Sequence, residues 1–292
     1  MKTWLVLDCH YLCHRNFHAM GDLKYEDTAT GVLFGFFRDV QDLQELHDTR
    51  NIVFCFDKGR SKRYDMLAGY KRSRAERYKS ESEIDKEKRK ELQKQISLLR
   101  DKELSKIGFK NVLSQDGYEG DDVIASVIHN LSKNELAIIV GTDQDLYQLL
   151  NKRVTIWNPH KTKAVTYDSV REEYGIGCEQ WADVKAIAGC KSDDIPGVVG
   201  VGEKTAASYL SGQLKGGKKF EAITAGNGQW RKNLKIVKLP LKGTGTFELQ
   251  EDKVTPKKWD KIMRKYGMSS LKDKGNGKSK KKKKRKAKGF GF

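Results

Sequence analysis

The sequence predicts an α/β fold in which a mostly parallel central sheet is flanked by helices. Two short apolar runs, TWLVLD (3–8) and NIVFCFD (51–57), are typical of buried strands, and each ends in an acid. FKNVLS (109–114) and ELAIIVG (135–141) predict two further strands. Because helical stretches separate these runs, we expect alternating strands and helices, the pattern that produces a parallel sheet.

The intervening helices are predicted from apolar residues at helical spacing. These residues are Leu33, Phe37, Val40 and Leu43 before the second run, and Val123, Val127 and Leu131 before the fourth. In open sheets of this kind, ligands bind at the carboxyl ends of the strands. Acidic residues that follow the strands are therefore expected to converge at one place.

The charge balance points to a polyanionic partner. The chain has 292 residues and a formal net charge of +18, and residues 272–288 contribute ten Lys and one Arg against one Asp, which leaves +8 for the rest. A basic folded region favours nucleic acid, because each neutralised phosphate releases condensed counterions. We expect residues 272–292 to be a disordered basic tail that adds affinity without sequence choice.

Membrane insertion and secretion are disfavoured. No apolar run approaches the ~20 residues of a spanning helix, and Asp8 interrupts the first apolar stretch too early for a signal peptide. Five scattered cysteines suit a reducing compartment, so we expect a cytoplasmic protein. The pairs Cys9-His10 and Cys13-His14 do not favour zinc, since adjacent side chains diverge and no second ligand pair follows.

Residues 58–106 differ in amino-acid composition from the rest of the chain. They are dense in charge and have only a thin apolar stripe at Leu92, Ile96 and Leu99, which predicts mostly solvated helix. One interpretation is an exposed charged hairpin. The other is a basic gate over the acidic residues, with stacking surfaces for unpaired bases at tyrosines that alternate with Arg and Lys. These tyrosines are Tyr64, Tyr70 and Tyr78.

The acidic residues predict a divalent metal centre. They are Asp8, Asp57, Glu119, Asp121, Asp122, Asp143, Asp145 and Asp193. Taken singly, each has an ordinary explanation, such as capping a helix or favouring its positive end. Together at one sheet edge they would repel one another and raise each other's pKa. Oxygen ligands without His or Cys select Mg²⁺ or Mn²⁺, and two such ions support phosphoryl displacement.

Six sequence blocks in order resemble the 5′ nuclease family, which includes phage 5′ exonucleases, the amino-terminal nuclease domain of bacterial DNA polymerase I, and flap endonucleases. The blocks are LVLDCHYLCHRNFHAM (5–20), TGVLFGF (30–36), FDKGRSKRYDMLAGYKRSR (56–74), YEGDDVIA (118–125), GTDQDLYQLL (141–150) and KSDDIPGVVGVGEKTA (191–206). The similarity runs from about residue 4 to about residue 212, and more faintly through NLKIVKLP (233–240). The resemblance implies a PIN-like nuclease core with a helical arch and a helix-hairpin-helix.

The resemblance also implies roles for individual residues. The residues implied around the first metal are Asp8, Asp57, Glu119, Asp121 and Asp122. Those implied around the second metal are Asp143, Asp145 and Asp193. A catalytic role is also implied for Asp8, Asp57 and Asp143. Lys71 and Arg74 stand where the family steers and polarises the scissile phosphate. The implied DNA-binding residues are Arg15, Arg72, Gly197, Gly200, Gly202, Lys204 and Thr205, and the hairpin is expected to hold K⁺.

The chain departs from the family pattern in its second metal site. Cys190 stands where the family usually has Asp, and a thiolate is a poor ligand for Mg²⁺. Asp194 stands where Asn is usual, and we hypothesise that it compensates. The expected consequence is a weaker second site, at which Mn²⁺ supports activity better than Mg²⁺. Cys9-His10 replaces the usual small residue and Asn after the first acid, which alters the pocket for the terminal nucleotide.

We therefore expect a structure-specific 5′ nuclease acting on DNA flaps, nicks and duplex ends as a monomer, with RNA–DNA hybrids as further targets. The expected organisation is a nuclease core at 1–177 that includes the arch at about 58–106, a DNA-binding region at 178–271, and the tail. A weakly active or non-catalytic branched-DNA-binding protein is the alternative, and a small ribonuclease of the related α/β group is less consistent with the arch and hairpin.

Overall fold

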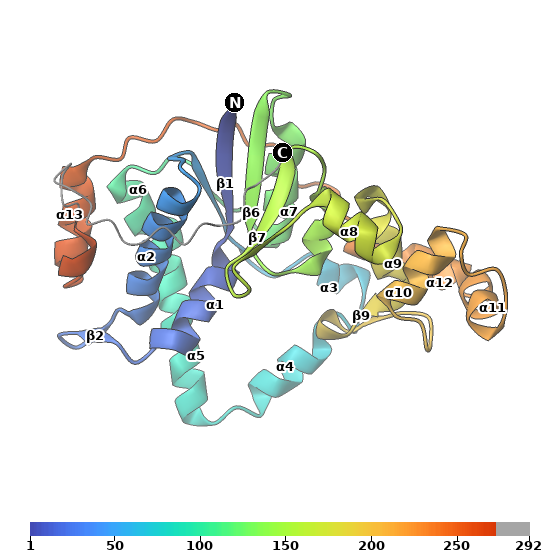
Figure 1. Ribbon diagram of the computed structural model, residues 1–292. Helices are drawn as coiled ribbons and strands as arrows, with labels where there is room; N and C mark the ends of the chain where they lie inside the picture. Colours follow the sequence, from blue (N-terminus) through green and yellow to red (C-terminus); the bar gives the residue numbers. More distant parts are fainter. Residues whose placement is uncertain (273–292) are drawn as a thin grey trace.

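The computed structural model describes residues 1–272, within which a six-stranded sheet has the order β5-β4-β1-β6-β7-β8 (Figure 1). Its strands are β1 (Lys2–Asp8), β4 (Ile52–Cys55), β5 (Val112–Leu113), β6 (Glu135–Val140), β7 (Val154–Asn158) and β8 (Lys163–Val165). All neighbouring pairs are parallel except β7 and β8. The predicted mostly parallel sheet is confirmed. The run FKNVLS forms only the short edge strand β5.

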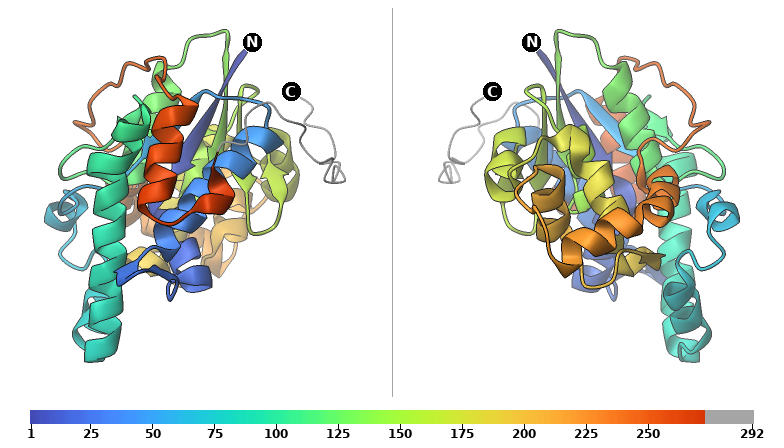
Figure 2. Two further views of the ribbon diagram at one scale, coloured as in Figure 1. Left: turned by 90° about the vertical axis from the view of Figure 1, so that its left-hand side faces the viewer. Right: turned by 90° about the vertical axis from the view of Figure 1, so that its right-hand side faces the viewer.

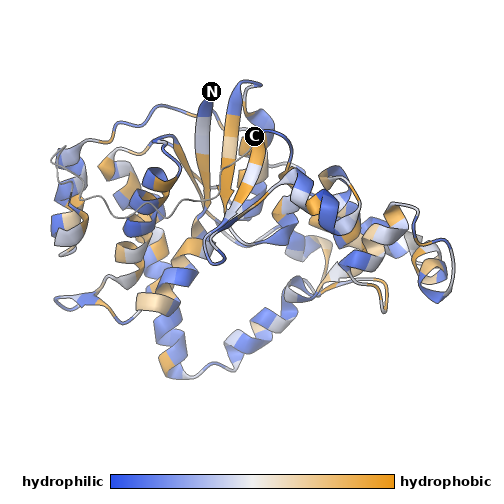
Figure 3. Cartoon of the chain, viewed as in Figure 1, coloured by the Kyte–Doolittle hydropathy of each residue, from blue (hydrophilic) through white to orange (hydrophobic). Residues whose placement is uncertain are grey.

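Alternate residues of the central strand β1 pack into two different hydrophobic cores, one on each face of the sheet. Leu5 and Leu7 pack into one apolar cluster and Trp4 and Val6 into the other, as the two-residue period of a strand requires. The central strands are correspondingly apolar in Figure 3. Burial of each large apolar side chain contributes about 1.5–3 kcal/mol, so the sheet is a rigid platform for residues at its edge.

Helices cover both faces of the sheet. The first core includes residues of α1 (Cys9–Met20), α2 (Gly31–Leu46), α5 (Glu83–Leu98), α6 (Leu104–Ile107) and α13 (Pro256–Lys265). The second includes residues of α7 (Gly120–Asn130), α8 (Tyr167–Tyr174), α9 (Trp181–Ala188), α10 (Glu203–Leu210) and α11 (Lys218–Ala225). No helix within residues 1–272 has the length and apolar character that a membrane span requires.

The charged segment after β4 leaves the body and returns to it (Figure 1). Its elements are α3 (Arg63–Met66), α4 (Arg72–Lys79), α5, the π-helical turn η1 (Leu99–Glu103) and α6. The prediction of a mostly solvated helix with a thin apolar stripe is confirmed for its returning half: most side chains of α5 are exposed or half-buried, while Leu92, Ile96 and Leu99 are buried in the first core. Gln95 also fixes this half, since its Oε1 accepts from the N–H groups of Val32 (3.1 Å) and Leu33 (3.2 Å) at the start of α2.

Several short elements pack around α9 and form the part of the second core that lies outside the sheet. They are the short turns η2 (Gln144–Leu149), η3 (Cys178–Gln180) and η4 (Lys191–Asp193), the ribbon β9 (Gly189–Cys190) and β10 (Ile195–Pro196), and the helices α10, α11 and α12 (Asn227–Val237). A separate hairpin, β2 (Lys24–Tyr25) and β3 (Thr28–Ala29), joins α1 to α2. The turn η4, between the two strands of the ribbon, lies against α4 near the start of the arch.

After α12 the chain crosses back to the sheet, and its last helix packs beside α6 (Figure 2). On the way, Asn111 next to β5 exchanges hydrogen bonds with the backbone of Gln250, at 2.9 and 2.8 Å. Trp259 and Met263 of α13 are buried in the first core, and the turn η5 (Ser269–Leu271) follows. The predicted DNA-binding region at 178–271 thus ends in a segment that packs on the predicted nuclease core. The predicted tail lies outside the described residues except for Lys272.

Candidate functional site

Acidic residues gather at the carboxyl edge of the three central strands. Asp8 ends β1, Asp57 follows β4 and Asp143 follows β6, and these strands are direct neighbours in the sheet. The start of α7 adds Glu119 and Asp121 to the same group. The convergence follows from parallel topology, which places all of these strand ends on one side.

Backbone N–H groups orient the three strand-end carboxylates. Asp8 accepts from the N–H of Tyr11 at 2.9 Å and thereby caps α1. Asp57 accepts from the N–H of Gly120 at 2.6 Å, which ties it to the start of α7. Asp143 accepts from the N–H of Asp145 at 2.8 Å and caps η2. The capping roles are therefore real, and they position these acids without excluding a metal role.

Burial and repulsion by neighbouring carboxylates raise the pKa values of Asp8, Asp121 and Asp145. Burial, followed by the charges of Asp57 and Asp143, raises the pKa of Asp8 to about 7. Burial and the charge of Asp143 raise the pKa of Asp145 to about 6. The pKa of Asp121 is raised well above its usual value by burial and then by Asp143. Such a group is stable in its ionised form only with cations among the carboxylates, and its oxygen donors fit Mg²⁺ or Mn²⁺.

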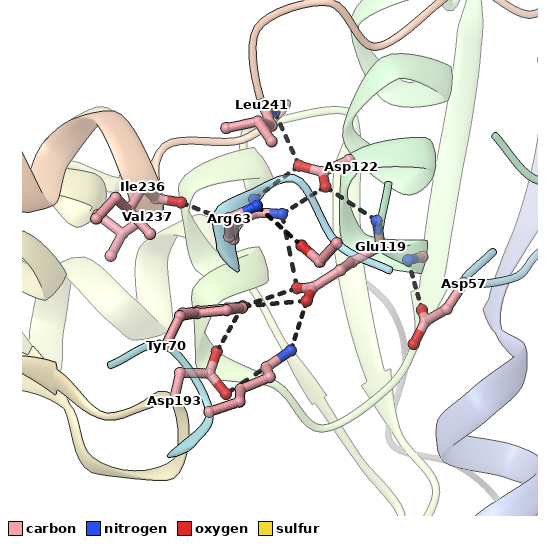
Figure 4. Close-up of polar contacts among 12 residues, drawn as sticks. Asp57, Arg63, Tyr70, Glu119, Asp122, Asp193, Ile236, Val237 and Leu241 are labelled. Carbon is pink, nitrogen blue, oxygen red and sulfur yellow. Dashed lines mark hydrogen bonds and ion pairs between the residues drawn. The ribbon is translucent and has the colours of Figure 1, made fainter. Parts of the chain in front are cut away.

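A second part of the site joins the acids to the base of the arch (Figure 4). The hydroxyl of Tyr70 lies 3.0 Å from Glu119 Oε2 and 3.2 Å from Asp193 Oδ2. Lys71 Nζ donates to Glu119 Oε1 at 2.6 Å and lies 3.8 Å from Asp193 Oδ1. Tyr70 is only 2% exposed, so the predicted stacking role is wrong for this tyrosine: its ring is buried and its hydroxyl bridges two carboxylates.

Lys71 is held in an unusual backbone conformation. Its φ is +51°, in the left-handed region that non-glycine residues rarely adopt, directly before α4. Its N–H donates to the carbonyl of Asp193 at 2.9 Å, which fixes the segment against η4. Strained residues of this kind cluster at functional sites, where the surroundings maintain them. Arg74, one turn further on, points an NH₂ group to Asp193 Oδ1 at 3.5 Å.

Asp122 lies apart from the other acids. Its carboxylate is fully buried and accepts two hydrogen bonds from Arg63, at 2.6 and 2.8 Å. The N–H groups of Leu241 (2.8 Å) and Glu119 (3.2 Å) donate to the same carboxylate. Figure 4 shows this cluster on the far side of Glu119 from Asp57. Both oxygens are thus engaged by the protein, which gives Asp122 a structural role instead of the implied metal contact.

The structure places Cys190 and Asp194, the two residues at which the second metal site departs from the family pattern. Cys190 Sγ lies within 4.8 Å of carboxylate oxygens of Asp145 and Asp193. Asp194 does not compensate for it, because its exposed carboxylate accepts from the N–H (2.8 Å) and hydroxyl (2.5 Å) of Ser73. The hypothesis of compensation is therefore wrong, and Asp194 instead ties the start of α4 to the turn after η4.

The basic and glycine residues implied for DNA binding have varied surroundings. Arg15 pairs with Asp39 at 2.9 Å, while Arg72 and Lys204 are exposed and Thr205 is half-buried in α10. Gly200 has a φ of +74°, and a Cβ there or at Gly202 would meet nothing within 4 Å. These two positions therefore leave open space beside the backbone. A Cβ on Gly197 would instead lie 2.0 Å from the carbonyl oxygen of Ala188, so packing requires that glycine.

Three residues at the site make contacts that the sequence reasoning did not predict. Arg63 pairs with Asp122, and His10 accepts from the N–H of Asp57 at 3.1 Å through Nδ1. Lys185 is buried in α9, 3.1 Å from Asp145 Oδ1 and 3.0 Å from Glu203 Oε1. Only Lys185 carried a usable signal, because a lysine within the otherwise apolar run VKAIA requires a buried partner.

A family model described as the 5′-3′ exonuclease, N-terminal resolvase-like domain, matches residues 3–175. The chain belongs to this 5′-3′ exonuclease family. It is 34% identical over 213 residues to the thermostable DNA polymerase I of Thermus aquaticus, a match that covers 70% of this chain and 23% of the polymerase. It is 30% identical over 213 residues to a 5′-3′ exonuclease of Aquifex aeolicus, a match that covers 72% of this chain and 69% of the exonuclease. The chain thus spans about a quarter of its polymerase relatives.

Solved structures of the 5′-3′ exonuclease fold agree with this placement. The T5 5′-exonuclease with bound divalent metal ions (zinc) has a TM-score of 0.68 at 24% identity, covering 82% of this chain and 90% of the other. Human GEN1 in complex with Holliday junction DNA has a TM-score of 0.56 at 14% identity, covering 91% and 68%. At these identities the likeness concerns the fold. The predicted family and fold class are confirmed.

Proposed function

We propose that this member of the 5′-3′ exonuclease family is a divalent-metal-dependent nuclease that hydrolyses phosphodiester bonds near the 5′ ends of branched or nicked DNA. The observation that carries the proposal is the convergence of acids from three neighbouring strands beside two cations from the arch. An acidic cluster in a chain of net charge +18 suits a bound polyanion whose reacting phosphate must be neutralised locally.

The metal-holding residues fall into two groups. Asp8, Asp57, Glu119 and Asp121 form the first, and Asp143, Asp145 and Asp193 form the second, with Asp143 electrostatically coupled to both. We leave Asp122 out because Arg63 and backbone N–H groups engage its oxygens. When bound, a pair of Mg²⁺ or Mn²⁺ ions supplies an activated water and charge neutralisation at the scissile phosphate.

Lys71 and Arg74 orient the substrate phosphate in this proposal. Although burial alone would lower the pKa of Lys71, the charges of Glu119 and Asp193 raise it, so the ammonium stays charged at neutral pH. The left-handed backbone and the hydrogen bond to Asp193 hold the ammonium beside the acids. A cation fixed in advance stabilises developing charge without a reorganisation cost.

The remaining basic surface would bind the rest of the DNA. The open space at Gly200 and Gly202 permits close approach of a phosphate backbone, with Lys204 and Thr205 at the adjoining helix start and K⁺ at the hairpin. Arg72 on the arch and Arg15 on α1 would contact the 5′ strand. Backbone contacts carry no base information, so specificity is for DNA shape. We further propose a monomer of the cytoplasm that also accepts RNA–DNA hybrids.

One observation favours a second candidate, a weakly active or non-catalytic binder of branched DNA. Cys190 occupies a position in the second metal group where a carboxylate would otherwise complete the set. Loss of an oxygen ligand weakens Mg²⁺ binding. The acids that remain, Asp143, Asp145 and Asp193, favour the nuclease.

Cleavage of a labelled 5′ flap in Mg²⁺ and in Mn²⁺ tests the proposal, with Asp143→Asn as the matched variant. We expect metal-dependent cutting near the junction that the variant loses while it still binds the flap. Binding without any cutting in either metal would establish the second candidate. Parallel flaps with RNA and DNA 5′ ends measure the preference between the two.

A further inference from the structure

A buried lysine lies beside the second metal group. Lys185 is in α9, and its side chain is only 8% exposed. Its Nζ lies 3.1 Å from Asp145 Oδ1 and 3.0 Å from Glu203 Oε1. A lysine is rarely buried unless its charge is paired, so these two carboxylates hold the ammonium in place. Lys185 lies outside the six sequence blocks that carry the family resemblance.

The packing of α9 sets the position of this ammonium. The helix packs against η2, α10 and α12, and Val184 and Ala186 on either side of the lysine are fully buried. Asp145 belongs to η2, and Glu203 to the first turn of α10. The ammonium is therefore shared between an acid of the metal group and the helix that follows the glycine hairpin.

The charges around Asp145 leave its carboxylate in need of a cation. Burial and the charge of Asp143 raise the pKa of Asp145, while the charge of Lys185 lowers it. Burial alone would lower the pKa of Lys185, but Asp145 and Glu203 raise it, so the ammonium stays charged at neutral pH. Lys185 thus supplies a positive charge beside a carboxylate that would hold a divalent ion.

We propose that Lys185 is a positioning residue for the second metal group, whose ammonium holds Asp145 in place without an ion and weakens the binding of a divalent ion there. The inference rests on the proposed function, because it concerns a metal group named there. Two cations beside one carboxylate repel each other, and the repulsion is strong where burial lowers the effective dielectric constant. When an ion binds, Glu203 remains as the partner of the ammonium.

This arrangement would make the second ion depend on the substrate. A DNA phosphate at the site adds negative charge, which offsets the repulsion between Lys185 and the ion. The group would then bind its ion tightly only with DNA in place. Without DNA and metal, the ammonium would keep the buried carboxylate of Asp145 paired.

Binding of Mn²⁺ to the metal-free full-length chain without DNA tests the inference. Calorimetry at about pH 8.5 keeps the ligand carboxylates deprotonated. Methionine is the matched change, since it keeps a long unbranched side chain and removes the charge. We expect Lys185→Met to bind the second Mn²⁺ at least about tenfold more tightly than the wild type. Lys185→Arg, which keeps the charge, should retain the weak binding of the wild type.

The sign of this change separates a charge effect from a merely structural one. If Lys185 only oriented Asp145, its loss would leave the second Mn²⁺ bound as weakly as in the wild type or more weakly. A second readout is urea unfolding. Lys185→Met should have a lower unfolding midpoint than the wild type without metal, because Asp145 and Glu203 lose their shared cation. Saturating Mn²⁺ should narrow the difference, since it binds the folded variant more tightly.

Controls separate this inference from folding and from the proposed function. Circular dichroism checks the fold, and Lys185→Gln is measured in the same way in case the methionine variant does not fold. Neutral variants that bind the second Mn²⁺ no more tightly than the wild type, or not at all, would overturn the inference. Because calorimetry needs no cleavage, flap cutting with unchanged Mn²⁺ affinities would defeat this inference alone. Tighter Mn²⁺ binding in a chain that cuts no flap would defeat the nuclease proposal alone.

Discussion

Replacing Asp122 with Asn separates a structural acid from the acids that we propose to hold metal. Asp122 is fully buried and accepts two hydrogen bonds from Arg63, which is itself 4% exposed. Asparagine has nearly the same shape but no charge, and its amide nitrogen cannot accept from the guanidinium. The substitution therefore leaves a buried cation without its main partner. Glu119, 3.6 Å from the guanidinium, offers only partial compensation.

Breaking a buried pair in this way costs about 3–5 kcal/mol. We expect the lower part of that range, because Glu119 remains nearby. A loss of that range corresponds to a fall in melting temperature of roughly 6–20 °C for a domain of this size. Thermal and urea unfolding of the metal-free protein, followed by circular dichroism, would measure it.

Asp121→Asn provides the matched control from the next position in the same helix. The pKa of Asp121 is raised by burial and by the charges of Asp143, Asp8 and Asp57, so removing its charge relieves repulsion. This variant should be as stable as the wild type or more stable without metal, and should bind Mn²⁺ more weakly. If Asp122→Asn instead unfolds like the wild type while its Mn²⁺ affinity falls, Asp122 is a metal ligand and the reasoning fails.

Three further outcomes are expected. Lys71→Ala should slow flap cleavage by at least about tenfold while leaving most flap binding intact, measured by single-turnover kinetics and gel shift; equal losses of both would count against its role at the phosphate. Because burial raises the pKa of Asp8 to about 7 and a ligand must be deprotonated, Mn²⁺ affinity by calorimetry should fall below pH 7, approaching about tenfold per pH unit for one displaced proton. Burial acts to raise the pKa of Glu103, but hydrogen bonds from Lys265 and Tyr266 hold it below its usual value. Glu103→Gln should thus cost about 1–3 kcal/mol in urea unfolding at pH 7, and the difference from the wild type should shrink as the pH falls below about 4; a constant difference would contradict the charge argument.

The sheet and its acidic edge could be predicted from the sequence because both depend on local pattern. Apolar runs identify strands whatever their neighbours, and parallel pairing then forces their carboxyl ends together. Asp8, Asp57 and Asp143 accordingly converge as expected. The short strand β5 was overestimated, because an apolar run does not reveal how much of it a neighbouring strand will pair with.

The roles of Tyr70 and Asp122 could not be predicted in the same way. Their partners lie far away in the chain: Tyr70 bonds to Glu119 and Asp193, and Asp122 to Arg63. Asp121 and Asp122 are adjacent acids of one helix start and differ only in the direction that each side chain takes. On a helix, neighbouring residues point about 100° apart, so one faces the acidic edge and the other the interior. The packing of α7 on β1 and β4 decides which.

The turn η4 connects the arch to the proposed metal centre. The carboxylate of Asp193 lies in the proposed second metal group, and its backbone carbonyl accepts from the N–H of Lys71. The next residue, Asp194, binds Ser73 at the first turn of α4. One short turn therefore positions both an acid of the metal group and the start of the arch. If the arch moves when a DNA strand binds to the proposed nuclease, the hydrogen bonds at Lys71 and Ser73 would couple that movement to Asp193, because both bonds join the arch to η4.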